Sequence, residues 1–385
     1  MKTMKKILII SIFIALAFMT GCVEKDVLSP EGKLVDIRFD TPVVNTLTKV
    51  HYGEIGTPYS TDESFTVFAV LHDTGFEGWS TNATPYISGS EFSYNAGHND
   101  STAGSGGWIS ATAYYWPFEG VLTFAGYSPS NAHSSSPGFD GDGKGQFSYG
   151  ADGLTITNFS VNADASFHQD VMYGKRVYNR TTSTGGTNAT YDGVDMEFQH
   201  TLASIQFNIQ LDKQYGSTTH FELKTIEVCE VKYKGSFKEN IVETVPTTYS
   251  SSPAWVLEED MTPQPYKAFD RTSDNMLNLD SNYKTGISDN YITLDEIQGQ
   301  NDLIVMPQVF NKGGVVNYNS HIRLEYVVTI GSSKFTQEAR INLKDLSEEW
   351  LSGNRYIYNI TIGYDNITVG ATSEWVDVNV TPTIK

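Results

Sequence analysis

Cysteine is almost absent from this chain, which has only Cys22 and Cys229 among its 385 residues. A disulfide framework of the kind that stabilises small secreted domains is therefore excluded, and stability has to come from core burial. Cys229 lies in an alternating run over residues 223–230, which predicts a small buried hydrophobic side chain. A catalytic thiol is the alternative interpretation of Cys229.

Long apolar runs are equally scarce, and the one at residues 7–19 is too short to span a bilayer, which needs about 20 residues. It follows three lysines in residues 1–6 and precedes Thr20-Gly21-Cys22. This order of a positive start, an apolar segment and small residues is typical of a signal peptide over residues 1–21.

Cys22 completes a lipoprotein cleavage motif, apart from Met19 where leucine is usual. Its thiol is expected to carry acyl chains, since lasting attachment to a membrane takes more than one chain. Residues 22–32 then serve as anchor and linker. An ordinary secretory signal with an incidental cysteine is the alternative. We expect lipid anchoring in the outer membrane and exposure at the cell surface.

Basic residues are outnumbered, with 26 Lys and Arg against 45 Asp and Glu. Removal of residues 1–21 takes away three lysines and no acid, which leaves 23 basic and 45 acidic residues, a formal charge of −22. Such acidity argues against nucleic acid as a partner and favours a soluble, exposed protein.

Helical periodicity is also rare, and apolar residues instead recur at every second position, as in half-buried strands. This alternation is clearest in residues 196–211, 322–330 and 356–364, and it predicts an all-β fold. The best helical segment is residues 345–352, where Asp345 would be the N-cap and Gly353 the stop.

Two domains are expected from the length of the chain. Residues 181–190 read TTSTGGTNAT, a composition typical of a loop, with strand-like segments on either side. We therefore expect an N-terminal β-sandwich over residues 33–185 and a C-terminal β-sandwich over residues 190–385.

A series of short motifs resembles the fimbrillin-like family of Bacteroidetes, lipoprotein pilins also called type V pilins. Each motif alone is weak, but their order and spacing along most of the mature chain are fairly specific. They are Tyr114-Tyr115-Trp116-Pro117, residues 122–129 (LTFAGYSP), Asp170-Val171-Met172-Tyr173, residues 198–205 (FQHTLASI), residues 304–308 (IVMPQ), residues 350–358 (WLSGNRYIY) and Trp375.

The resemblance implies two transthyretin-like β-sandwiches in tandem and a role as stalk, tip or anchor subunit of a fimbria. In this family a trypsin-like protease cuts behind the first strand, which leaves and is replaced by a strand from a neighbouring subunit. Here Val35, Ile37 and Phe39 alternate in the candidate first strand. Lys49 stands at the cleavage position, before Val50, although arginine is commoner there. An uncut protein with Lys49 in a solvated loop is the alternative.

The other end of the chain offers a candidate donor strand, because Val376, Val378 and Val380 alternate with polar residues. Only ten residues follow Trp375, so this segment is equally a candidate for the last strand of the second domain.

Motifs for chemistry are weak. Ser281 and Lys284 fit S-x-x-K, but the related serine-enzyme motifs crowd into one polar loop here, which indicates coincidence. Residues 140–145 hint at a calcium loop but lack the required twelfth-position glutamate. The histidines show no zinc-ligand spacing, and His200 is interpreted as structural. We expect no catalysis, no metal and no cofactor.

The partners expected are other fimbrial subunits, the outer membrane through its lipid anchor, and a host or glycan ligand. A second functional class stays open: a monomeric surface lipoprotein that binds glycans. It would use aromatic side chains in Gly-rich loops, such as Trp79 and Trp108, as stacking platforms. Core-capping is the simpler interpretation of these two rings.

Overall fold

The computed structural model of the chain describes residues 35–39, 42–44, 57–73, 79, 83–97, 99–100, 104–130, 145–181, 193–242, 249–259, 265–271, 275–283, 291–294, 302–364, 366–373, 376–380 and 383–384. Strands make up nearly all of its regular structure, together with two 3-10 turns, η1 (Ala165–Phe167) and η2 (Leu343–Asp345). The predicted all-β fold is confirmed. No helix in the described ranges is both long and apolar enough to cross a membrane.

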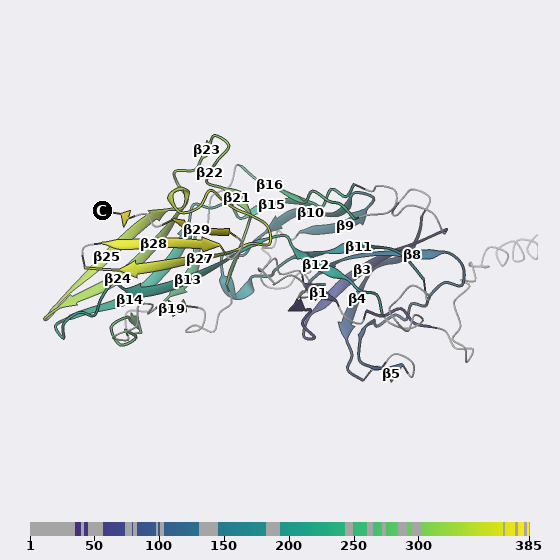
Figure 1. Cartoon of the computed structure of the whole chain (residues 1–385), viewed down its shortest axis with the longest axis horizontal. Coiled ribbons are helices and arrows are strands. Elements are labelled where there is room, and N and C mark those ends of the chain that lie inside the picture. The colour runs from purple at the N-terminus through teal and green to yellow at the C-terminus, as the bar shows by residue number, and fades with distance from the viewer. Residues whose placement is uncertain are drawn as a thin grey trace, which may run out of the picture.

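The molecule is elongated, with the chain's earlier strands at one end and its later strands at the other (Figure 1). In the N-terminal half, an eight-stranded sheet has the order β2-β1-β12-β11-β8-β3-β4-β7. Its strands are β1 (Val43–Val44), β2 (Thr57–Pro58), β3 (Ser64–His72), β4 (Thr84–Tyr94), β7 (Trp108–Ser110), β8 (Val121–Ser128), β11 (Met172–Arg180) and β12 (Glu197–His200). A separate pair, β5 (Asn99–Asp100) and β6 (Gly104–Ser105), extends one loop.

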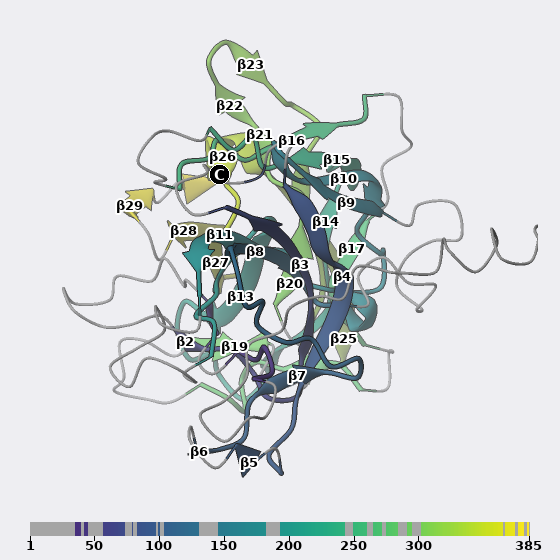
Figure 2. The ribbon, with the colours of Figure 1, turned by 90° about the vertical axis from the view of Figure 1, so that its right-hand side faces the viewer.

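A four-stranded sheet packs on one face of this large sheet. Its order is β16-β15-β10-β9, with β9 (Gln146–Gly150), β10 (Gly153–Ser160), β15 (Lys234–Lys238) and β16 (Ala254–Leu257). The ring of Tyr127 on β8 lies 4.6 Å from that of Phe147 on β9. All eight residues of β8 are buried, because both faces of its sheet are covered. Seen end-on, β3, β4 and β8 curve beside one another (Figure 2).

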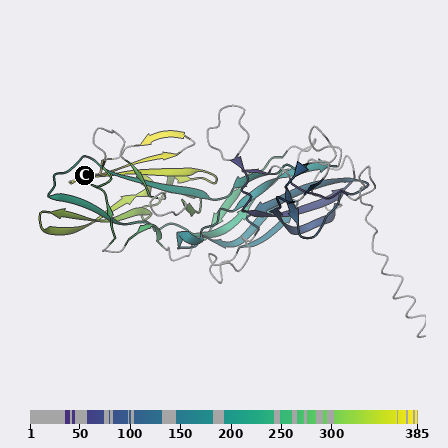
Figure 3. The same cartoon turned by 90° about the horizontal axis from the view of Figure 1, so that it is seen from below.

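The C-terminal half is a sandwich of two sheets, visible as two layers in Figure 3. One has the order β19-β13-β27-β28-β29, with β20 added to β13 and β30 to β28; the other has the order β17-β14-β24-β25, with β18 added to β14. The strands are β13 (Ala203–Leu211), β14 (Thr219–Cys229), β17 (Tyr266–Asp270), β18 (Leu277–Asn278), β19 (Ile292–Thr293), β20 (Leu303–Val305), β24 (His321–Ile330), β25 (Ser333–Asn342), β27 (Arg355–Ile362), β28 (Ile367–Ser373), β29 (Val376–Val380) and β30 (Thr383–Ile384).

Two small strand pairs complete this half. β21 (Gln308–Val309) pairs with β26 (Glu349–Trp350), and β22 (Asn311–Lys312) pairs with β23 (Val315–Val316) in a hairpin that projects from the rest of the molecule (Figure 2).

The strands predicted from alternation are present where expected. β13 alternates buried and half-buried residues throughout, and β27 does the same while it pairs with β13 in parallel. β24 covers the predicted segment 322–330. Alternation succeeded here because β13 and β27 bury only one face, so that apolar residues recur at every second position. β24 follows the same pattern apart from Val327, which is also buried.

The helix predicted over residues 345–352 is wrong. The chain instead forms η2 at Leu343–Asp345 and then strand β26. Leu343 and Trp350 are fully buried, and Trp350 is held by its pairing with Gln308 on a distant segment. The capping residues predicted a helix here, but long-range packing determines the structure, as it commonly does in short segments.

The chain crosses between the halves more than once. β12 follows the loop over residues 181–190 yet pairs with β11 and β1 of the N-terminal half. β15 and β16, which lie between β14 and β17 in sequence, extend the sheet of β10. Strands that follow the boundary expected at residues 185–190 therefore pair with strands that precede it. Most of that boundary loop lies outside the described residues.

Candidate functional site: the seat of the first strand

Residues 35–39 form an extended segment whose odd-numbered side chains are buried. Val35, Ile37 and Phe39 are exposed by only 3%, 3% and 0%. They are the three residues predicted to face inward in the first strand. The alternation of apolar residues in the sequence therefore corresponds to the apolar face of a single extended segment.

Phe39 is the deepest of the three side chains. Its ring makes edge-to-face contacts with those of Phe65, Phe92 and Phe124, at centroid distances of 5.2, 5.1 and 5.8 Å. These rings come from β3, β4 and β8, the central strands of the large sheet. We call this apolar lining, together with the backbone of residues 108–116 beside it, the first-strand seat.

Backbone hydrogen bonds fix the segment along one side of the seat. Ile37 N–H donates to Tyr114 O at 2.7 Å, and Trp116 N–H donates to Val35 O at 2.9 Å. Phe39 and Trp108 exchange both of their backbone bonds, at 3.1 and 2.9 Å. The segment thus behaves as an antiparallel strand against residues 108–116.

The opposite side of the segment is also engaged. Val194 N–H donates to Arg38 O at 2.8 Å, and further on β1 runs parallel to β12 with Val43 beside Glu197. The segment is therefore inserted between residues 108–116 and the chain leading into β12. Its removal would leave backbone donors and acceptors unpaired on both sides.

Arg38 lies within this segment and is exposed by only 2%. Burial of its side chain and hydrogen bonding of its backbone both protect the bond that follows it from a protease. The burial of Arg38 does not follow from the alternation of residues 35–39, which places even-numbered residues toward solvent.

Cys22, Lys49 and Val50 lie outside the described residues. In sequence, Lys49 falls between β1, which ends at Val44, and β2, which begins at Thr57. Cleavage there would separate both residues 35–39 and β1 from the rest of the chain.

Val376, Val378 and Val380, the candidate donor residues, lie on β29. Its backbone pairs with β28, with Val380 beside Ala371 and Val376 beside Ser373. β29 occupies the edge of its sheet in the C-terminal half.

The rings of the two tryptophans considered as platforms for sugars are covered by other side chains of the protein. Trp108 is exposed by only 5% and packs against Tyr94 at 4.8 Å. Trp79 has the guanidinium of Arg176 over its ring at 5.1 Å and lies 4.8 Å from the ring of Tyr149. Both rings therefore cap or fill the core, and the stacking role considered for Trp108 is wrong because its ring is not at the surface.

Cys229 ends β14 and is buried, as its alternating context predicted. Burial raises the pKa of its thiol, and nearby charges have smaller effects in both directions. A thiol kept protonated is a poor nucleophile, so the hydrophobic interpretation holds.

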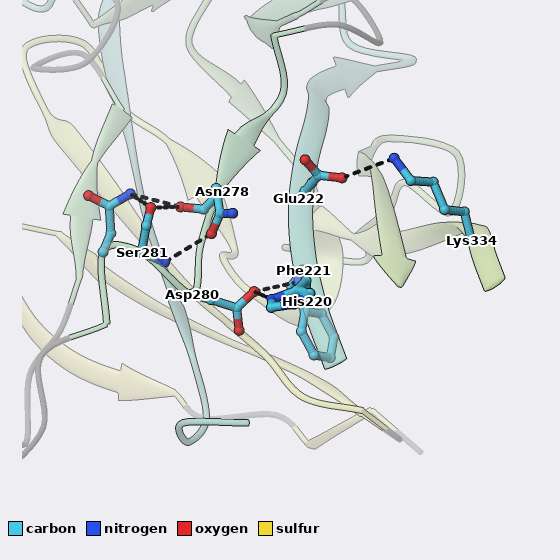
Figure 4. A network of polar contacts seen from close by, with 8 residues as sticks. His220, Phe221, Glu222, Asn278, Asp280, Ser281 and Lys334 are labelled. Atoms are coloured by element: carbon cyan, nitrogen blue, oxygen red, sulfur yellow. Dashed lines mark hydrogen bonds and ion pairs between the residues drawn. The ribbon is translucent and has the colours of Figure 1, made fainter. Parts of the chain in front are cut away.

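Ser281 has its hydroxyl engaged in a local turn (Figure 4). It donates to Asn278 O at 3.0 Å, while Ser281 N–H donates to Asn278 Oδ1 at 2.9 Å. Lys334, the lysine drawn in this view, faces Glu222 at 3.9 Å. Lys284 and residues 140–144 of the calcium-like loop lie outside the described residues.

His200 contacts Asp170, with 2.5 Å between Nδ1 and Oδ2. Burial lowers the pKa of His200, but the charge of Asp170 and the hydrogen bond to it outweigh burial, so the pKa is raised. The pair joins the end of β12 to the chain before β11, which agrees with a structural role. Among the described residues, no group of three His, Cys, Asp or Glu side chains is placed to hold a metal.

The family model described as fimbrillin-like matches residues 55–376, most of the chain. The chain belongs to the fimbrillin-like family. Membership supports a role for this fimbrillin-like chain as a fimbrial subunit or adhesin at the cell surface, in contact with other fimbrial subunits.

Solved structures similar to this fimbrillin-like chain include a fimbrial protein from Bacteroides vulgatus, with 18% identity, 89% of this chain and 100% of that chain covered, and a TM-score of 0.48. A putative cell adhesion protein from Bacteroides uniformis has 12% identity, coverage of 89% and 99%, and a TM-score of 0.39. The tip fimbrial protein Mfa3 from Porphyromonas gingivalis has 12% identity, coverage of 88% and 99%, and a TM-score of 0.34. No curated protein sequence matches the chain. At these values the family assignment rests on the family model alone.

Proposed function

We propose that this protein is a non-catalytic fimbrial subunit that assembles by strand exchange at the first-strand seat. The observation that supports this proposal most directly is the way in which residues 35–39 are held in the structure. They form a separate strand with three buried side chains, and residues 45–56, which contain Lys49, separate this strand and β1 from β2.

Loss of residues 35–39 alone would leave an unstable subunit. Each buried Val, Ile or Phe side chain contributes roughly 1.5–3 kcal/mol, so the three together approach the total stability of many domains, about 5–15 kcal/mol. The exposed backbone of residues 108–116 adds unpaired hydrogen-bonding groups. A strand from a neighbouring subunit satisfies both needs at once, which makes the exchange strong and hard to reverse.

Cleavage between Lys49 and Val50 by a trypsin-like protease would start this process. Arg38 does not compete, since it is buried in the seated segment. The incoming strand is proposed to be the segment of Val376, Val378 and Val380 from another subunit, which would have to leave β28 in its own subunit first. Stalk, anchor and tip positions in a fimbria remain open to such a subunit.

Lipid attachment at Cys22, after removal of residues 1–21, would anchor the newly exported chain in the outer membrane. Several acyl chains on one cysteine give the durable attachment that a single chain lacks. The described residues need no cofactor for this function, because assembly by strand addition uses only backbone pairing and apolar burial.

Limited trypsin digestion of purified residues 23–385 tests the proposal, with intact mass, N-terminal sequencing and a gel run without boiling. We expect a stable fragment that begins at Val50 and a ladder of detergent-resistant oligomers. The matched variant Lys49→Gln should resist cleavage at this position and stay monomeric. A fragment that begins at Val50 but remains monomeric would contradict strand exchange. An uncut monomer that binds polysaccharide would favour the glycan-binding lipoprotein instead.

A further inference from the structure

The outer edge of β25 is long and open. β25 is the last strand of its sheet and pairs along all ten of its residues with β24, while no described strand lies on its other side. Residues 333–338 are exposed on both faces, at the end of the molecule away from the first-strand seat (Figure 1). An open edge of this length presents a row of backbone groups that can pair with another strand.

The hairpin geometry tells which backbone groups face outward. A two-residue turn, Gly331-Ser332, joins the strands, with Gly331 at φ +60° and Ile330 opposite Ser333. In such a hairpin the closing pair is hydrogen-bonded, and bonded pairs recur at every second residue. Odd-numbered residues of β25 therefore bond to β24, whereas Lys334, Thr336 and Glu338 direct their N–H and C=O groups outward.

The even-numbered residues of β25 and the odd-numbered residues of β24 share one face of this sheet, and charges of the same sign lie opposite one another there. The register places Arg323 opposite Arg340 and Glu325 opposite Glu338, and like charges in such positions repel. The two β24 charges are compensated from β14, where Glu227 contacts Arg323 and Lys224 lies 2.6 Å from Glu325.

The β25 charges are compensated less completely. Glu338 forms no ion pair with any residue in the described ranges, and its charge acts on Arg323 more weakly than that of Glu227 does. Lys334, whose side chain is 67% exposed, reaches Glu222 only at 3.9 Å. A strand outside the sheet, with a positive charge opposite Glu338 and a negative charge opposite Lys334, would improve the charge balance at this edge.

We propose that β25 pairs edge to edge with β25 of a second copy of this chain, antiparallel about a twofold axis at Thr336. This register joins only outward-facing residues, as a hydrogen-bonded ladder requires. It sets Lys334 of each copy opposite Glu338 of the other, so that two symmetry-related pairs of opposite charge form across the contact. An isologous contact of this kind is self-complementary by symmetry.

The apolar face of the edge fits the same register. Phe335 is 47% exposed and lies on the face opposite to Lys334 and Glu338. About the Thr336 axis the two Phe335 side chains become diagonal neighbours, a spacing of about 7–8 Å between backbones that aromatic rings can bridge. The pairing thus buries two exposed rings while it joins the charges.

The contact is small, and each copy carries a formal charge of −22 once residues 1–21 are removed. Free molecules should therefore associate weakly, whereas copies held side by side on a membrane or along fibres gain from their high effective concentration. The edge lies in the C-terminal half, so the contact needs no cleavage at Lys49 and stands independently of strand exchange.

Thiol crosslinking of uncut residues 23–385 tests the twofold axis. The one native cysteine of that segment, Cys229, is buried. In Thr336→Cys the two Cα atoms should lie about 5.5 Å apart across the axis. At a protein concentration high enough to populate this weak contact, a short bis-maleimide should then give covalent dimers at least about tenfold faster than in the exposed control Ser252→Cys, because the thiols of an associated pair share a high effective concentration. Equal rates in the two variants would overturn the proposal, as would faster crosslinking of Ala339→Cys, which marks a different register.

Charge reversal then tests the residue pair. In the Thr336→Cys background, Lys334→Glu should slow crosslinking to the rate of the Ser252→Cys control, because this substitution sets a carboxylate opposite Glu338 of the second copy. The double variant Lys334→Glu with Glu338→Lys should restore the fast rate, since the pair is only exchanged. A single variant without effect, or a double variant as slow as the single, would overturn the assigned register.

Discussion

Phe39 carries much of the attachment of the first strand. It is fully buried among the rings of Phe65, Phe92 and Phe124. Phe39→Ala should lower the free energy of unfolding by about 3–5 kcal/mol, through lost burial and the cavity left behind. Urea denaturation measures this loss. Phe118→Ala, at a 65% exposed position, is the matched control and should change stability by less than about 0.5 kcal/mol.

His168 should make the protein sensitive to mild acid. Its Nδ1 accepts a hydrogen bond from Ile304 N–H at 2.9 Å, so the neutral ring is required there. Burial lowers the pKa of His168 to about 4 from 6.5. Between these values the unfolded state binds the extra proton, so the contribution of His168 to stability is constant above pH 6.5 and falls as pH drops toward 4.

The expected loss from His168 across this pH window is about 3 kcal/mol. Urea unfolding at pH 7, 5.5 and 4.5 should show a steeper decline in the unmodified protein than in His168→Gln, whose side chain does not titrate. Identical slopes would contradict the assignment of the neutral ring.

His200 should have the opposite effect, since its contact with Asp170 raises its pKa. A raised pKa adds stability that is fully present below pH 6.5 and lost as pH rises through the folded-state value. The difference in unfolding free energy between the unmodified protein and His200→Gln should therefore be larger at pH 6 than at pH 9. A difference that does not change with pH would show that the contact with Asp170 is not an ion pair.

At the scale of strands, two glycines make room for packing next to the seat. Gly126 on β8 pairs with Gly174 on β11, and a Cβ on Gly126 would lie 2.4 Å from the backbone oxygen of Thr66. Gly126→Ala should therefore lower the melting temperature clearly, by about 2–4 °C for each kcal/mol of strain in a domain of this size. Gly370→Ala, on β28 with nothing within 4 Å of the new methyl group, is the control and should leave it unchanged or raise it.

Strands that bury one face were predictable from sequence, and elements fixed by distant contacts were not. β13, β24 and β27 alternate because one side of each meets the core. β8 is buried throughout, so its residues carry no period of two, and only its pairing with β3 and β11 defines it. The helix predicted over residues 345–352 failed for a related reason, since β26 is held by β21.

The candidate site was predictable in part for the same reason. Val35, Ile37 and Phe39 are three alternating residues, and their burial followed from that spacing alone. The rings that receive Phe39 come from β3, β4 and β8, far along the chain, and no local pattern joins them to residue 39. The burial of Arg38 does not follow from this spacing, because it arises from chains on both sides of the segment.

At the scale of the whole molecule, the N-terminal half depends on residues that arrive late in the sequence. Phe237 on β15 packs against Tyr173 on β11 at 5.9 Å, and Phe198 on β12 lies 5.2 Å from Phe65 on β3. A fragment of residues 33–185 lacks β12, β15 and β16. Each missing buried Phe alone removes roughly 1.5–3 kcal/mol of burial, and three edges of sheet are left open.

We therefore expect the fragment of residues 33–185 to show no cooperative urea transition and no near-ultraviolet circular dichroism of packed aromatic rings, whereas residues 23–385 show both. Coexpression with a separate fragment of residues 190–385 should restore both signals, because that fragment supplies β12, β15 and β16. A sharp transition in the 33–185 fragment alone would mean that these strands are dispensable, and that the N-terminal sandwich ends at the loop predicted from sequence.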